Sequence, residues 1–139
     1  MSMMIGDLYL CFSEANLELQ RVKASHMADI SQQESQLASM RENHTRTQQE
    51  QQDKVDRLLE EGRPEAEIAR AERRLGWLVG RHRQLEGTKE DEINNQRERY
   101  EVEEERMQRL VDELEDDNYF ELNKLKEERQ REQRRLLEA

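Results

Sequence analysis

Apolar residues recur along the first half of the chain in alternating steps of four and three. Leu8, Phe12 and Leu19 begin this pattern, and polar residues fill most of the positions between them. Such spacing places apolar side chains on one face of an α-helix, here called the seam. We therefore expect a helix over residues 7–61, preceded by a short apolar arm at residues 1–6. The predicted seam residues of this helix are Phe12, Leu19, Ile30, Leu37, Met40 and Leu58.

A turn signal at residues 62–64 separates this seam from a second one. Gly62 suits the left-handed conformation that follows many helix ends, and Arg63, which precedes a proline, is disfavoured in helical geometry. Pro64 suits the first position of a new helix, where its missing N–H costs nothing. We expect the second helix over residues 65–138. Its predicted seam residues are Ile68, Leu75, Leu78, Leu85, Ile93, Tyr100, Met107, Leu110 and Leu114.

Two details of the second helix depart from a simple seven-residue repeat. Gly87 could end one helix and Thr88 could cap the start of another. An interruption near 87–88 is therefore an alternative to a continuous helix. In addition, Leu114 and Leu125 are eleven residues apart. Intervals of this length locally unwind a left-handed supercoil.

A short connection between two long helices favours an antiparallel hairpin, in which the residue numbers of facing positions here add up to about 126. His44 then faces His82, His26 faces Tyr100, and the seams meet over nearly the whole first helix. The alternative is an extended parallel dimer that is kinked at Pro64. The favoured fold class is all-α, a long antiparallel coiled-coil helical hairpin.

Several apolar residues lie off the seam and would stay exposed in a lone hairpin. Leu59, Trp77, Val102 and Val111 are examples. Two helices bury only one thin line of side chains, whereas a four-helix bundle buries more. We therefore expect protein partners: a second copy of the chain, giving a dimer or larger bundle, or another coiled-coil protein.

Composition narrows the possible functions. The chain has 139 residues, of which 40% are charged and 33% are hydrophobic, and its formal net charge is -10. So acidic a chain is a poor match for nucleic acid or for an anionic membrane surface. It has one cysteine, Cys11, and its three histidines show no metal-ligand spacing, so we expect no metal and no cofactor. A thin helical pair also lacks the concave pocket that a small-molecule substrate needs, so we expect no enzyme.

Three groups of residues outside the seam are candidate partner surfaces. One is a tryptophan between two glycines, which would let another helix approach closely. The second is an arginine-rich stretch that suits an acidic partner, and the third is an apolar group that the hairpin would bring to one end. The simpler interpretation of each is a solvated helix face. The residues are, in that order, Trp77; Arg73, Arg74 and Arg81; and Leu8, Tyr119 and Phe120.

The Arg-, Glu- and Gln-rich composition, together with a long discontinuous seam, is similar to segments of cytoskeletal, ciliary and centrosomal coiled-coil proteins. The resemblance implies a structural interaction element: a spacer, an oligomeriser or a brace. One alternative is an adaptor that recruits one partner through its apolar end, and another is nucleic-acid binding through residues 70–83. The apolar start contains Asp7 and lacks the basic residues of a secretory signal. We therefore expect a cytoplasmic location, with a cytoskeletal one as a variant.

Overall fold

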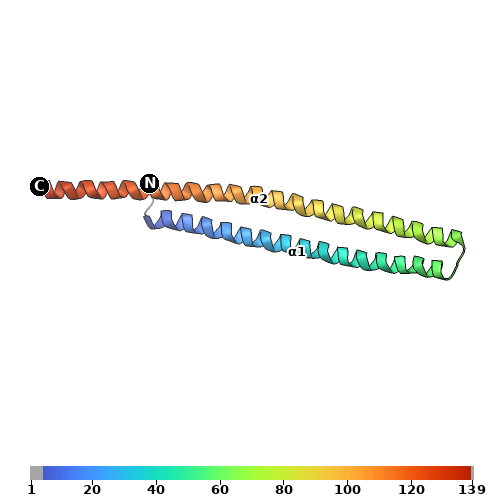
Figure 1. Cartoon of the computed structure of the whole chain (residues 1–139). Helices are drawn as coiled ribbons and strands as arrows, with labels where there is room; N and C mark the ends of the chain where they lie inside the picture. The colour runs from blue at the N-terminus through green and yellow to red at the C-terminus, as the bar shows by residue number, and fades with distance from the viewer. Residues whose placement is uncertain (1–4, 139) are drawn as a thin grey trace. The chain divides into compact units, whose positions relative to one another are not determined.

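The computed structural model describes the backbone of residues 5–138 and the side chains of residues 11–138. This part of the chain contains two helices, α1 (Ile5–Glu60, 56 residues) and α2 (Glu65–Glu138, 74 residues), and no strand. The chain divides into two compact units. Unit 1 joins α1 up to Met27 with α2 from Arg99 onward, and unit 2 is Ala28–Glu98. In each unit a segment of α1 packs against a segment of α2 (Figure 1).

Both helices are long because good helix formers fill them and few residues oppose helical geometry. α1 begins at Ile5, two residues before the expected start. α2 runs through Gly87 and Thr88, so the interruption considered near 87–88 does not form. The Thr88 hydroxyl donates a hydrogen bond of 2.9 Å to the Gln84 carbonyl oxygen, one turn earlier. The hydroxyl is therefore satisfied within the helix and does not cap a new one.

In unit 2 the chain reverses through a tight turn after α1 (Figure 1). Gly62 has φ of +64°, and its N–H donates to the Leu59 carbonyl oxygen at 3.2 Å. The next N–H, from Arg63, reaches back to the Leu58 carbonyl oxygen at 3.1 Å. These two bonds form a Schellman motif, which satisfies carbonyls that the helix end leaves without partners. Gly62 therefore has the left-handed backbone that its residue type suits.

α2 begins at residue 65, the first residue of its expected range. The first helical residue is Glu65, so Pro64 precedes the helix. The Pro64 carbonyl oxygen accepts from the N–H groups of Glu67, at 3.0 Å, and Ile68, at 3.2 Å. Arg63 also pairs with the Glu67 carboxylate, its Nε lying 3.3 Å from Oε2. Glu65 and Glu67 place negative charge in the first turn, where the helix dipole favours it.

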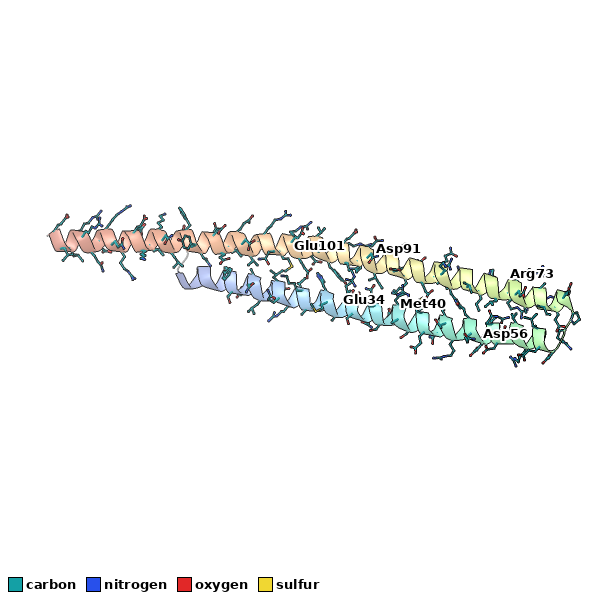
Figure 2. All side chains as sticks on the ribbon, in the orientation of Figure 1. Glu34, Met40, Asp56, Arg73, Asp91 and Glu101 are labelled. Atoms are coloured by element: carbon teal, nitrogen blue, oxygen red, sulfur yellow. The ribbon has the colours of Figure 1, made fainter. Side chains whose placement is uncertain are left out.

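Each unit has its own narrow core. In unit 2 the buried apolar side chains include Leu37, Val55, Ala71 and Ile93. In unit 1 they include Leu19 and Val111. The charged residues labelled in Figure 2, among them Asp56, Arg73 and Asp91, are exposed. Most of the other predicted seam residues are half-buried: Phe12, Ile30, Met40, Leu58, Ile68, Leu75, Leu78, Tyr100, Met107 and Leu114.

Two predicted seam residues of α2 are wrong. Leu110 is 53% exposed, whereas its neighbour Val111 is only 4% exposed, and Leu85 is exposed beside the half-buried Glu86. The cause is the period of the seam. Ile93 and Val111 are eighteen residues apart, which is five turns of an ordinary α-helix at about 3.6 residues per turn. Repeated steps of seven, at about 3.5 residues per turn, drift away from that face.

Candidate functional site

A pair of stacked imidazole rings lies between α1 and α2 in unit 2. The ring centroids of His44 and His82 are 3.7 Å apart, and the ring planes differ by only 3°. His82 is buried and His44 is half-buried. The antiparallel register predicted this contact, and the structure confirms it. We call His44, His82 and their polar neighbours the imidazole layer.

A hydrogen bond joins His82 to Gln48 in this layer. The Gln48 side chain lies with its amide Nε2 3.0 Å from His82 Nδ1. Which of the two groups donates depends on the tautomer of the ring and on the orientation of the amide. A doubly protonated ring donates at Nδ1, so Gln48 would then have to present its Oε1 atom.

The charged groups of the imidazole layer come from both helices. His44 Nδ1 is buried and lies 3.7 Å from the Glu86 carboxylate, which is beyond hydrogen-bond distance. The Arg41 Nε atom lies 3.9 Å from the same carboxylate. Arg41 also pairs with Glu90 through its Nη2 atom, at 3.3 Å. Each charged group of the layer therefore has an opposite charge within 4 Å.

Burial is the main cause of a lowered pKa at His82, below the ordinary value of 6.5. The neighbouring His44 lowers this pKa further, because two positive charges would repel each other. Glu86 acts in the opposite direction and raises it. The net direction is downward, so the layer favours a neutral His82.

A second stacked pair lies in unit 1. The rings of His26 and Tyr100 have centroids 3.7 Å apart and planes that differ by 10°. His26 Nε2 is 3.4 Å from Glu103, and its Nδ1 is 3.6 Å from Glu104. The register predicted this ring contact as well. We call these residues the tyrosine layer.

The imidazole and tyrosine layers repeat the same pattern along each helix. His26 and His44 are eighteen residues apart on α1, and Tyr100 and His82 are eighteen apart on α2. In both layers the α2 ring is followed by a glutamate four residues later, Glu104 or Glu86. The chemical difference is that the α2 ring is a phenol in one layer and a second imidazole in the other.

The candidate partner-surface residues lie on exposed faces and do not form one site. Tyr119 and Phe120 are 70% and 68% exposed in unit 1, whereas Trp77 is 68% exposed in unit 2. Arg73, Arg74 and Arg81 are also exposed in unit 2. A Cβ placed on Gly76 or Gly80 would meet nothing within 4 Å, so no helix of the described chain packs on these glycines. The side chain of Leu8 lies outside the described residues.

Sequence reasoning missed the polar partners of the two layers. Gln48 and Glu86 complete the imidazole layer, and Glu104 contributes to the tyrosine layer. The sequence does contain a pattern that could have predicted the two glutamates. Glu86 and Glu104 each follow the aromatic residue of α2 by four positions, and residues at this spacing share a helix face. In the described part of the chain, no three His, Cys, Asp or Glu side chains are grouped to hold a metal ion. No helix among the described residues is long and apolar enough to cross a membrane.

No protein-family model matches the chain, and no curated protein and no solved structure matches it either. Its function is therefore argued from its own residues.

Proposed function

We propose that this chain is a structural coiled-coil element for protein–protein interaction, which joins copies of itself as a spacer, oligomeriser or brace. A cytoplasmic, cytoskeletal or ciliary assembly is the proposed setting, and the partners are proteins. Catalysis is not part of the proposal. The observation that supports the proposal most directly is an apolar face of α2 that continues past the beginning of α1.

This face belongs to the overhang, defined here as residues 122–138 of α2. In unit 1, α2 extends beyond the first residue of α1 (Figure 1). Leu125 and Leu136 follow the half-buried Leu114 at intervals of eleven residues, or about three helical turns each. They therefore continue the seam face, yet Leu122, Leu125 and Leu136 are all exposed. A second helix on this face would extend the seam that α1 begins.

We propose that the occupant of this face is the overhang of a second copy, paired in the antiparallel direction. Leu125 of one copy would then face Leu136 of the other, and Arg129 would face Glu132. A twofold pair makes each such contact twice. The overhang has six basic and four acidic residues in a chain of net charge -10, so the pair avoids bringing two strongly acidic segments together.

The mass of the particle in solution tests this proposal. Light scattering over a range of protein concentrations should show a dimer or larger species for the unmodified chain. The double substitution Leu125→Gln and Leu136→Gln should shift it to a monomer, because it removes the apolar face. The matched control, Tyr119→Ser with Phe120→Ser, should keep the mass. An unchanged mass in the leucine variant would contradict pairing through the overhang.

A bridging experiment distinguishes the hairpin from the extended parallel dimer. His44→Cys and His82→Cys, in a chain that also carries Cys11→Ser, place two thiols where the stacked rings lie. A short bis-maleimide should link them within one chain. A link between two chains at residue 44 would favour the parallel dimer.

An adaptor function is the second candidate, and the exposure of Tyr119 and Phe120 supports it. Adjacent exposed aromatic side chains are frequent anchors in protein interfaces. An adaptor should lose its partner in the Tyr119→Ser and Phe120→Ser variant while keeping its helicity and mass. The nucleic-acid alternative through residues 70–83 predicts binding that weakens steeply with salt. A flat salt response would remove it.

A further inference from the structure

We propose that the imidazole layer is a pH-responsive element, which loosens the pairing of α1 and α2 in unit 2 when both of its rings are protonated. This proposal is independent of self-association through the overhang. It depends on the stacking of His44 and His82, on their burial and on the groups that surround them.

One proton can be accommodated at this layer. His44 Nδ1 lies 3.7 Å from Glu86, so a charged His44 gains an ion pair with that carboxylate. Arg41 competes for the same carboxylate at 3.9 Å, and Arg41 is itself held at 3.3 Å by Glu90. The first proton therefore changes the charge of the layer while leaving the stacked rings in place.

The second proton cannot be accommodated in the same geometry. It must go to His82, whose Nδ1 lies 3.0 Å from the Gln48 amide nitrogen. His82 is 8% exposed, and its ring lies 3.7 Å from the His44 ring. A charged His82 would thus require the Gln48 amide to present its oxygen, stay largely out of water and lie beside another positive charge. Separation of the two helices at this point relieves all three costs.

The tyrosine layer provides an internal reference for this behaviour. Its α2 ring is Tyr100, which gains no positive charge in acid, and two carboxylates lie within 3.6 Å of the nitrogens of His26. Only one imidazolium can form there. The two layers have the same ring separation. They differ in the second titratable ring and in the neighbouring charges, since two carboxylates face His26 whereas Glu86 and Arg41 lie beside His44.

Hydrogen exchange measured at pH 7.5 and pH 5.5 tests the proposal. Rates are divided by the intrinsic chemical rate at each pH, and peptides covering residues 40–50 and 78–90 are compared with those covering 20–30 and 96–106. Acid should increase opening in the first pair several-fold more than in the second, with a ceiling of about tenfold per pH unit for each proton gained. Equal changes in both pairs of peptides would overturn the proposal.

The matched variant is His82→Tyr, which gives the imidazole layer the ring composition of the tyrosine layer. It should keep its protection at pH 7.5 and lose the additional opening at pH 5.5. If this variant does not fold, the ring resonances of the unmodified chain decide. His44→Gln should raise the midpoint of His82, because it removes the neighbouring ring that lowers it. An unchanged midpoint of His82 in this variant would overturn the proposal.

Discussion

Gly62 and Gly76 should respond in opposite ways to replacement by alanine, because Gly62 has a positive φ and Gly76 lies within a helix. At Gly62 the left-handed backbone lets the last carbonyls of α1 find donors in the turn. At Gly76 the backbone is helical, where a glycine contributes more chain entropy to the unfolded state than an alanine does. A Cβ on either residue would meet no atom within 4 Å. Backbone conformation alone therefore decides the effect of a methyl group.

We predict that Gly62→Ala destabilises the chain by about 1–2 kcal/mol, the cost of a left-handed backbone for a residue with a Cβ. Gly76→Ala should instead stabilise it by about 0.5–1 kcal/mol. Urea unfolding followed by circular dichroism measures both. Equal effects of the two substitutions would show that φ at Gly62 does not control the turn.

The imidazole layer gives the stability of the chain a pH dependence. Burial and His44 hold the pKa of His82 below 6.5 in the folded chain. Just below pH 6.5 the unfolded chain therefore binds more protons at this residue than the folded chain, and the free energy of unfolding decreases as the pH falls. The lost stability returns as the pH rises above 6.5.

We predict a smaller decrease between pH 7.5 and pH 5.5 for His82→Tyr than for the unmodified chain. The difference between the two slopes reports the effect of the second imidazole in the layer, because both chains share every carboxylate. Urea unfolding at the two pH values gives both slopes. A variant with the same slope as the unmodified chain would show that His82 does not supply the pH dependence.

At the scale of the helices, the sequence carries enough information for the turn and the register. Gly62 and Pro64 act locally, so their residue types indicate the reversal directly. A short turn then determines which residues face each other, and both ring pairs follow. The choice between Leu110 and Val111 could not be made in this way, because both are apolar and adjacent. It depends on whether the seam advances at 3.5 or 3.6 residues per turn, which only the packed helices reveal.

The two adjacent residues also test where the seam lies. We predict that Val111→Ala costs about 1.5 kcal/mol of stability, since two methyl groups leave a buried site. Leu110→Ala should change stability by less than about 0.5 kcal/mol, although it removes more atoms, because Leu110 is mostly exposed. Thermal unfolding of the two variants compares them directly. A larger loss of stability for Leu110→Ala than for Val111→Ala would show that the seam follows the seven-residue pattern and contains Leu110.

At the scale of the whole molecule, net charge and apolar surface act against each other. A net charge of -10 favours separate, soluble chains. The exposed leucines of the overhang favour association. The polar partners of the candidate layers could not be predicted, because they depend on side-chain rotamers such as that of Gln48. The continuation of the seam to Leu125 and Leu136, in contrast, can be read from spacing alone.

Removal of the overhang should separate folding from association. In a chain that ends at Glu121, the segments of α1 and α2 that carry the buried residues are all retained. A dimer that forms only from folded chains raises the unfolding midpoint as protein concentration increases. We therefore expect the midpoint of the full chain to rise with concentration and that of the shortened chain to stay constant.

The midpoints of the full and shortened chains should converge on dilution, because the overhang buries little within its own chain. Calorimetry over a hundredfold range of concentration makes the comparison. A shortened chain with a lower midpoint at every concentration would assign the overhang a role in folding, contrary to its proposed role in joining copies.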